Sequence, residues 1–280
     1  MLDEILETAV EAARAGGTVL RWRFGDESLV VDSKGLHDYV SQADRDSEEA
    51  VVTAVRRRHP DHRIVAEESG ETGGGDGEHE WLIDPLDGTT NFLQGLPVFA
   101  VSVACLRHGE IVAGAILDPL RDDLFTACRG DGAFWNGRRL AVSRRPGIDG
   151  AFLATGYPFK AKGALDAYLG AFRSALQRAG AIRRCGAAAI DLAYTAAGIY
   201  DGFFELRLSP WDLAAGVLLI EEAGGVVSDL DGGDRFLAGG NVVAGTPAVH
   251  RELLAIFAEH ASEGLVDRLV PNRSPVGVDA

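Results

Sequence analysis

Residues 81–92, which read WLIDPLDGTTNF, decide the fold of this chain and hold its most informative acids. The apolar residues at the start form a short run that is typical of a buried strand. Because Pro85 cannot donate a hydrogen bond to a sheet ladder, we expect this strand to end at Asp84. Asp87 follows after a tight turn, so the two carboxylates can converge on one point.

The residues after Asp87 predict an anion site. Gly88 and Thr89 open what we expect to be a short helix, and its free N–H groups can hold a phosphate. Two acids beside such a site would repel the anion unless cations lie between them. The arrangement therefore favours divalent metals that bridge carboxylate and phosphate oxygens. An isolated Asp-Gly pair would be an ordinary turn, but the whole string from 84 to 90 is far more specific.

Two further segments place acids where apolar runs meet turns. Glu67 and Glu68 end a predicted strand at 63–66, and Asp212 stands in the first turn of a predicted helix at 211–223. Taken singly, the glutamates are ordinary surface charges and Asp212 is an ordinary acid at a helix N-terminus. Taken together, acids at the ends of successive elements indicate one shared metal site.

The composition is that of a globular protein with one large domain or two closely packed halves, since 46% of its 280 residues are apolar. The formal charge of −15 argues against general nucleic-acid binding, although bound cations would let an acidic protein accept phosphate esters. No apolar run approaches the ~20 residues of a membrane span, and the N-terminus lacks the features of a signal peptide. We therefore expect a cytoplasmic enzyme with no membrane partner.

Carboxylates must be the ligands if a metal binds. Cys105, Cys128 and Cys185 form no CxxC pair and are expected to be buried thiols. The seven histidines form no ligand motif, and His59 and His62 are expected at the surface in a polar turn. Oxygen ligands alone favour a hard cation such as Mg²⁺.

Helices and strands alternate along the rest of the chain, which predicts layered sheets and helices. Residues 2–22 form an amphipathic helix, and a second helix runs over 44–58 with Asp44 as its N-cap. Residues 98–106 and 111–117 form a hairpin. The second half is expected to contain strands at 151–155, 181–184, 202–205, 225–228 and 241–244 and helices at 164–179, 187–198, 211–223 and 247–259.

A polar, turn-rich stretch at 143–150 marks the boundary between two halves. The N-terminal α+β half, 1–145, carries most of the expected metal ligands. The C-terminal α/β half, 146–262, carries Asp212 and the expected substrate contacts. A polar tail, 263–280, completes the chain.

Three motifs in this sequence resemble the signature motifs of the inositol monophosphatase family. They are AEES at 66–69, DPLDGTT at 84–90, and WDLAAG at 211–216, which runs into EAGG at 222–225. They stand in the family's order and spacing, and the similarity covers roughly residues 3–260. The resemblance implies an alternating αβαβα sandwich, two or three Mg²⁺ ions, inhibition by lithium, and a homodimer.

The resemblance also assigns roles to individual residues. Glu67, Asp84 and the backbone carbonyl of Leu86 are similar to the family's ligands of the first magnesium, and Glu67 supports a third ion through water. The second magnesium is expected on Asp84, Asp87 and Asp212. Asp44 matches an acid that hydrogen-bonds Thr89, and water oriented by Glu67 and Thr89 attacks phosphorus without a phosphoenzyme. The implied substrate contacts are Asp87, Gly88, Thr89, Gly186, Ala188, Glu205 and Asp212.

The resemblance leaves the substrate open. Inositol 1-phosphate is our leading expectation among polyol and sugar phosphates, because a carboxylate at Glu205 can accept hydrogen bonds from neighbouring hydroxyls. Histidinol phosphate, fructose 1,6-bisphosphate and 3′-phosphoadenosine phosphates are substrates of relatives with the same metal site. A regulatory role through binding the transcription machinery is the alternative from another class. The chain departs from the family at Gly186-Ala187-Ala188, where relatives carry a hydroxyl residue in the middle.

Overall fold

The computed structural model describes residues 2–26, 28–35, 38–74, 77–157 and 165–261, so the expected tail at 263–280 lies outside the described residues. The helices are α1 (Leu2–Arg23), α2 (Gln42–Arg58), α3 (Thr89–Leu93), α4 (Leu165–Arg178), α5 (Ala188–Ala196), α6 (Pro210–Glu222), α7 (Phe236–Gly239) and α8 (Pro247–Ala261). The strands of the first half are β1 (Val31–Gly35), β2 (Asp38–Ser41), β3 (Arg63–Ala66), β4 (Gly70–Thr72), β5 (His79–Asp87), β6 (Ala100–Arg107), β7 (Glu110–Asp118), β8 (Asp123–Cys128), β9 (Gly132–Trp135) and β10 (Arg138–Arg139). Those of the second half are β11 (Phe152–Thr155), β12 (Ala181–Arg183), β13 (Gly202–Glu205), β14 (Val226–Ser228) and β15 (Val242–Gly245).

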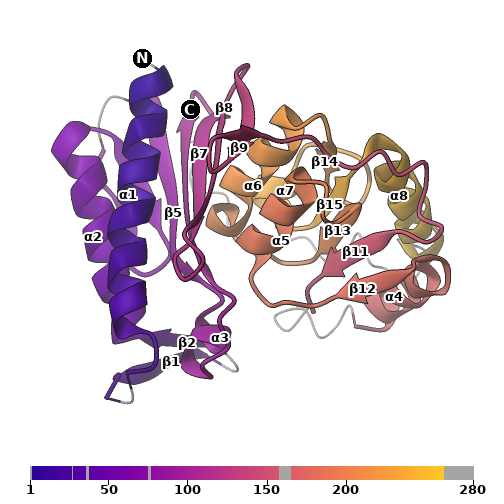
Figure 1. Ribbon diagram of the computed structural model, residues 1–280, viewed down its shortest axis with the longest axis horizontal. Coiled ribbons are helices and arrows are strands. Elements are labelled where there is room, and N and C mark those ends of the chain that lie inside the picture. Colours follow the sequence, from indigo (N-terminus) through magenta and orange to yellow (C-terminus); the bar gives the residue numbers. More distant parts are fainter. Residues whose placement is uncertain (1, 27, 36–37, 75–76, 158–164, 262–280) are drawn as a thin grey trace, which may run out of the picture.

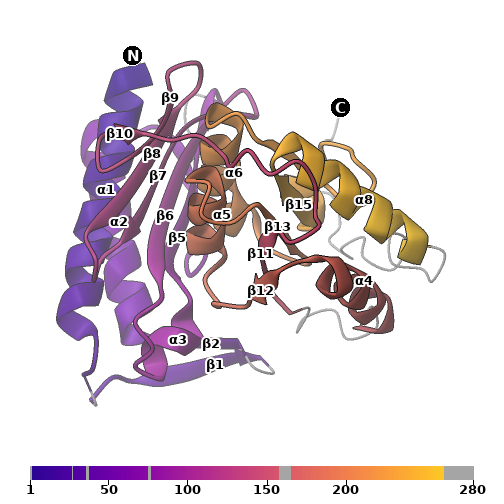
Figure 2. The ribbon, with the colours of Figure 1, turned by 45° about the vertical axis from the view of Figure 1, so that its right-hand side comes forward.

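These elements form five layers, which confirms the expected αβαβα sandwich. Helices α1 and α2 cover one face of an eight-stranded sheet of order β10-β9-β8-β7-β6-β5-β3-β4, and α5 and α6 cover its other face (Figure 1). The same two helices lie against a five-stranded sheet of order β12-β11-β13-β15-β14. Helices α4 and α8 pack together on the far side of that second sheet (Figure 2).

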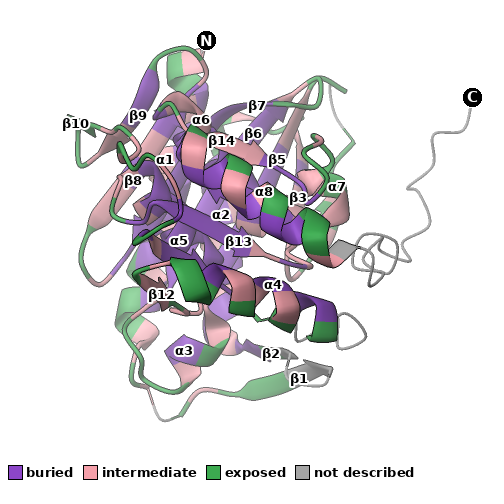
Figure 3. Cartoon of the chain, turned by 90° about the vertical axis from the view of Figure 1, so that its right-hand side faces the viewer, coloured by how far each residue is buried: buried purple, intermediate pink, exposed green. Residues whose placement is uncertain are grey.

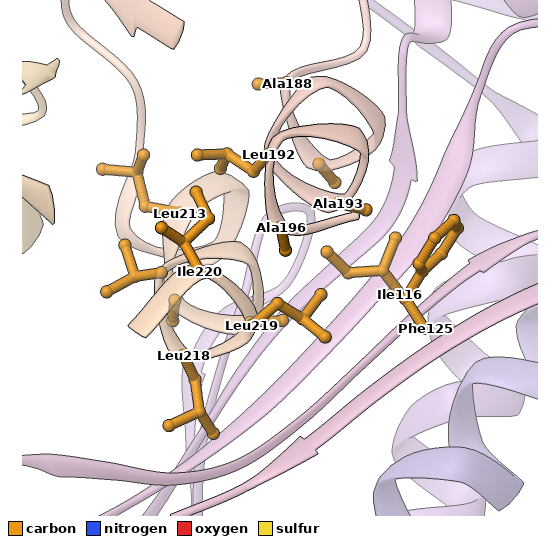
Figure 4. Packing of buried hydrophobic residues seen from close by; sticks show 14 of the residues in the cluster. Ile116, Phe125, Ala188, Leu192, Ala193, Ala196, Leu213, Leu218, Leu219 and Ile220 are labelled. Carbon is orange, nitrogen blue, oxygen red and sulfur yellow. The ribbon is translucent and has the colours of Figure 1, made fainter. Parts of the chain in front are cut away.

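The middle layer is strongly apolar, because it is covered on both faces. Residues 213–220 of α6 are all buried, as expected for a helix that lies between two sheets. Leu192 of α5, Leu219 of α6 and Ile116 of β7 lie in one cluster there (Figure 4). The outer helices α4 and α8 instead alternate buried and exposed residues along their length (Figure 3).

Gly114 lets α6 rest directly on the first sheet. A Cβ at Gly114 would lie 2.9 Å from the Cα of Ala215, closer than real side chains approach. A glycine inside a strand costs stability by itself, but it permits this close backbone contact. The contact fixes how far the start of α6, which carries Asp212, stands from the strands of the first sheet.

Strand β5 runs further than we expected from the sequence. It continues through Pro85 to Asp87, whereas we expected it to end at Asp84. The pairing with β6 is irregular between Asp84, opposite Ser102, and Asp87, opposite Ala100. A proline fits in a strand where the ladder is interrupted, so the irregularity accommodates Pro85 without a lost hydrogen bond.

The start of α2 also corrects the sequence analysis. Ser41, not Asp44, is the N-cap, and its side chain accepts a hydrogen bond from the Ala43 N–H at 3.2 Å. Asp44 is the third helical residue, and its Oδ2 accepts from the Ser41 N–H at 2.8 Å. The two residues therefore form a capping box, in which both side chains satisfy backbone donors at the helix start.

His59 and His62 lie in a stack of rings rather than on the open surface where we expected them. The His62 ring stacks on His59 at 4.5 Å between ring centroids and on His79 at 4.4 Å. The indole N–H of Trp81 donates to His62 Nδ1 at 3.0 Å. Both residues are half-buried, and the stack ties the turn before β3 to the start of β5.

None of the helices in the described part of the chain combines the length and the apolar character needed to cross a membrane. The sequence analysis missed the hairpin of β1 and β2, the strands β4, β9 and β10 and the short helix α7. These elements are two to five residues long, so their sequences carry too few periods for a pattern to show.

Candidate active site

Three carboxylates from three separate elements meet at one point. Glu67 follows β3, Asp84 lies in β5, and Asp212 lies in the first turn of α6. One oxygen of each lies within 4.8 Å of the others. Strands β3 and β5 are parallel and Ala66 lies opposite Ile83, so Glu67 and Asp84 come next to each other just after this pair. The structure thus brings together three of the acids that the sequence analysis singled out.

Backbone donors hold two of these carboxylates in place. Asp84 is buried, and its Oδ1 accepts from the Leu86 N–H at 2.9 Å. Asp212 Oδ2 accepts from the Ser209 N–H at 2.7 Å, in a capping box at the start of α6. The first-turn role that the sequence suggested for Asp212 thus coexists with its place in the cluster.

Glu48 supports the turn that carries Glu67, and the sequence analysis did not identify it. This buried glutamate on α2 accepts from the Glu68 N–H through Oε2 and from the Ser69 N–H through Oε1, both at 2.8 Å. Its four-residue spacing from Asp44 places the two acids on one face of the helix. That spacing is the feature of the sequence from which Glu48 could have been identified.

The cluster suits a hard divalent cation. All three donors are carboxylate oxygens, and two oxygens on one ion at about 2.0–2.6 Å lie at most about 4–5 Å apart. Burial raises the pKa of Asp84 well above its usual range, and the charges of Glu67, Asp212 and Asp87 raise it further. Acids that repel one another in this way are stabilised by a cation placed among them.

Asp87 lies beside the cluster and joins the two halves of the chain. Its Oδ1 accepts from the Ala188 N–H at 3.2 Å, and its Oδ2 accepts from the Ala189 N–H at 2.7 Å, at the start of α5. Burial raises the pKa of Asp87 to about 8, and the charge of Asp212 adds to the rise while the two backbone bonds oppose it. The carboxylate therefore interacts with a helix start and with the cluster at once.

Thr89 and Asp44 form the expected hydrogen bond. The Thr89 hydroxyl lies 3.0 Å from Asp44 Oδ1 and 3.1 Å from the Leu86 carbonyl oxygen, so its single proton is donated to one of them. Ser41 donates to the other oxygen of Asp44 through both its N–H and its hydroxyl. Burial raises the pKa of Asp44, and the hydrogen bonds from Ser41 and Thr89 oppose that rise. Asp44 thus fixes the Thr89 hydroxyl at the start of α3.

Gly88 and Gly186 bring the expected phosphate and substrate segments together. A Cβ at Gly88 would lie 3.0 Å from the Val98 carbonyl and 3.3 Å from the Gly186 carbonyl. Both glycines have positive φ values, 95° and 89°, which other residues rarely adopt. The Asn91 side chain donates to the Val98 and Cys185 carbonyls at 2.8 and 2.9 Å, which fixes α3 against the loop before α5.

Glu205 and Ala188 lie on the second half, as expected. Glu205 ends β13, and burial raises the pKa of its carboxyl well above the usual range. The charges of Asp87 and Asp212 raise this pKa further. The Ala188 N–H already donates to Asp87, so a substrate contact through this N–H would have to share it.

These features define a layered α/β protein with a cluster of carboxylates that suits a hard divalent cation. The chain belongs to the Inositol monophosphatase family, whose sequence profile matches residues 1–263. It is 46% identical over 265 residues to the Nus factor SuhB of Salmonella typhimurium, with 94% of this chain and 99% of that protein covered. It is 47% identical over 251 residues to an inositol-1-monophosphatase of Mesorhizobium japonicum, with 89% and 94% covered. The crystal structure of extragenic suppressor protein suhB from Bartonella henselae superposes with a TM-score of 0.88 at 43% identity, covering 91% of this chain and 98% of that one.

Proposed function

We propose that this protein is a Mg²⁺-dependent phosphomonoesterase that hydrolyses inositol 1-phosphate to inositol and phosphate. The observation that carries the proposal is the convergence of Glu67, Asp84 and Asp212 within 4.8 Å, with Asp87 alongside. Family membership and the similarity to a protein named inositol-1-monophosphatase support it.

The expected ligand sets are those that the resemblance to the family implies. Glu67, Asp84 and the Leu86 carbonyl would hold one ion, and Asp84, Asp87 and Asp212 would hold another. Bound divalent cations would neutralise the phosphate charge and stabilise the departing alkoxide, which is a poor leaving group in water.

The chain's own groups orient the attacking water and the ester. Asp44 accepts the Thr89 proton, which leaves the Thr89 oxygen free to accept a hydrogen bond from water beside Glu67. The backbone N–H groups of Gly88 and Thr89 would bind the phosphate oxygens. Asp87 fixes the start of α5, so Ala188 and its neighbours face the ester's alcohol side from a rigid element.

A panel of phosphate esters tests the proposal. We expect inositol 1-phosphate to give the highest kcat/KM in the presence of Mg²⁺, ahead of histidinol phosphate and fructose 1,6-bisphosphate. EDTA should abolish the activity, and added Mg²⁺ should restore it. Full turnover in metal-free buffer would contradict a metal-dependent mechanism. A higher kcat/KM for another ester would make that ester the preferred substrate. The homodimer and the lithium sensitivity that the resemblance implied, and the cytoplasmic location expected from the composition, remain predictions.

Glu205 should determine the preference for a polyol. Its carboxylate can accept two hydrogen bonds from neighbouring hydroxyls of an inositol ring. We therefore expect Glu205→Gln to lower kcat/KM for inositol 1-phosphate by about tenfold, the cost of weakening a hydrogen bond to a charged acceptor. Hydrolysis of glycerol 2-phosphate, which lacks the ring, should fall much less. Equal losses on both esters would show that Glu205 is structural.

A regulatory role through the transcription machinery is the second candidate. The observation that favours it is the name of the Salmonella relative, Nus factor SuhB. A pulldown with the tagged full-length chain, probed for RNA polymerase and antitermination factors, tests it directly. Recovery of these proteins together with phosphatase activity would show that both roles belong to one molecule. Their absence would leave only the enzymatic role.

A further inference from the structure

Ser47 of α2 is a buried residue that the proposed mechanism does not use. Helices α1 and α2 lie side by side on the first sheet (Figure 1), and a Cβ at Gly16 of α1 would lie 2.7 Å from Ser47 Oγ. Ser47 is 0% exposed. The buried face of such a helix is ordinarily apolar, and burying a hydroxyl is costly unless it forms a hydrogen bond. The acceptor of this hydroxyl therefore decides what Ser47 does.

The Ser47 hydroxyl turns away from its own helix. Inside a helix, a serine hydroxyl ordinarily bonds to the carbonyl four residues earlier or points to solvent. Ser47 Oγ instead donates to the Pro85 carbonyl oxygen at 2.8 Å, across 38 positions of sequence. The acceptor belongs to β5, in the short segment between Asp84 and Asp87.

The peptide group that accepts this bond also holds Asp84. The carbonyl of Pro85 and the N–H of Leu86 belong to one planar peptide unit. The Leu86 N–H donates to Asp84 Oδ1 at 2.9 Å. Two hydrogen bonds in series thus connect the Ser47 hydroxyl to the Asp84 carboxylate through one peptide. Because a hydrogen bond to a carbonyl polarises its peptide, the first bond strengthens the second.

The pairing of β5 with β6 is irregular at this peptide. Asp84 lies opposite Ser102 and Asp87 opposite Ala100, and the register shifts between them. Pro85 has no N–H to donate. The peptide between Pro85 and its neighbour therefore lies outside the regular ladder, and the bond from α2 fixes its rotation.

Helix α2 makes comparable contacts to two other segments of the site. Asp44 Oδ1 lies 3.0 Å from the Thr89 hydroxyl, at the start of α3. Glu48 accepts two backbone N–H groups of the turn after β3, both at 2.8 Å. Asp44, Ser47 and Glu48 are three and four residues apart, so they share one face of the helix. One rigid element thus holds three segments that carry or adjoin the expected metal ligands.

We propose that Ser47 is a positioning residue for the metal site, which fixes the Pro85–Leu86 peptide and thereby the orientation of the Asp84 carboxylate toward a bound Mg²⁺. This inference deepens the proposed function, on which it rests. Mg²⁺ demands near-ideal octahedral geometry, whereas Ca²⁺ accepts flexible arrangements of oxygen ligands. A carboxylate that can turn therefore weakens the binding of Mg²⁺ more than the binding of Ca²⁺.

Ser47→Ala tests the inference by calorimetric titration of each cation into the metal-free, full-length chain. We expect the Kd of Mg²⁺ to rise about tenfold, as is typical when a group that supports a metal ligand is removed. The Kd of Ca²⁺ should rise less than about threefold, because its coordination is more tolerant. An equal rise for both cations would show that the substitution loosens the structure in general. That outcome, or an unchanged Kd of Mg²⁺, would overturn the inference.

Ser228→Ala is the matched control. Ser228 is a buried serine of β14 in the second sheet, and its hydroxyl lies 2.9 Å from the Asp229 carbonyl oxygen and 2.8 Å from His250 Nε2. Both alanine variants lose a buried hydrogen bond, so Tm in EDTA should fall in both. Ser228→Ala should leave both values of Kd within about twofold of the wild type, because it shares no partner with the site. The same loss of discrimination between the cations in this control would contradict a specific role of Ser47.

Ser47→Cys provides a second variant in case the alanine variant does not fold. The thiol occupies the place of the hydroxyl but is a weak donor, so the preference for Mg²⁺ over Ca²⁺ should fall by about threefold. A wild-type preference in Ser47→Cys would refute the inference.

Ester hydrolysis, measured on the same samples, separates this inference from the proposed function. A wild-type chain that binds Mg²⁺ but hydrolyses no ester of the panel would refute the proposed function. The comparison of the Kd values of Mg²⁺ and Ca²⁺ would still decide the role of Ser47.

Discussion

Asp87→Asn should lower kcat/KM for inositol 1-phosphate by at least ~10²-fold. This is the upper end of the loss of activity that follows when a group supporting a metal ligand is removed. The substitution keeps the shape of the side chain but removes the charge that would face the second cation. It also places an amide donor against one of the two N–H groups that now donate to Asp87. Both changes act on the site and neither creates a cavity, so the variant should fold.

Glu78→Gln is the matched control for this prediction. Glu78 is exposed, and it lies 3.9 Å from Arg107 in a solvent-exposed pair. Surface pairs of this kind contribute little to stability, so rate and stability should remain within about twofold and 1 °C of the wild type. Steady-state kinetics at saturating Mg²⁺ measures kcat/KM for both variants. Similar losses in the two variants would refute the assignment of Asp87 to the site.

The sequence predicted the convergence of the acids because each one ends or begins a strongly patterned element. Glu67 follows an apolar strand, Asp84 lies in another, and Asp212 opens an apolar helix. Parallel strands end at one edge of a sheet, so local patterns were sufficient to bring the first two together. The family resemblance then supplied the order of the layers, which the structure confirms.

The path of the chain between Asp84 and Asp87 could not be predicted in the same way. Pro85 indicated a strand end, but the irregular pairing with β6 lets the strand continue to Asp87. Such an irregularity depends on the partner strand, which is distant in sequence. The capping box at α2 was different, because Ser41 followed by Asp44 three residues later is close to its known signature and was readable.

The burial of Asp191 depends on tertiary packing, so the sequence offered no signal for it. An acid in the first turn of a helix is ordinarily a solvent-exposed charge that interacts with the helix dipole. Here α5 lies between two sheets, so the same residue is 1% exposed.

Asp84→Asn should abolish activity and yet stabilise the metal-free protein. Burial and the charges of Glu67, Asp212 and Asp87 raise the pKa of Asp84 well above its usual range. An asparagine keeps an acceptor for the Leu86 N–H and directs an N–H₂ donor at the neighbouring carboxylates. In EDTA at pH 8.5 we expect Tm to rise by roughly 4 °C or more, which corresponds to about 1–2 kcal/mol in a domain of this size.

The gain in Tm of Asp84→Asn should depend on pH, in a direction that follows from the raised pKa of Asp84. A carboxyl whose pKa is raised by folding binds its proton more tightly in the folded state, so stability is lost as pH rises through the folded pKa. For the neighbouring Asp87 that pKa is about 8. The difference in Tm between Asp84→Asn and the wild type, measured in EDTA, should therefore be small at pH 5 and increase towards pH 8.5.

Mg²⁺ should reverse the order of the two proteins. A cation that binds only the folded state raises the wild-type Tm in proportion to the logarithm of its concentration, and the variant lacks a ligand for it. Asp122→Asn, at a side chain that is 60% exposed, should show neither the gain in EDTA nor the reversal. If Asp84→Asn lowers Tm in EDTA at every pH, the acids do not repel one another in the folded chain. The case for a cation among them would then fail, because that repulsion is what a bound cation would relieve.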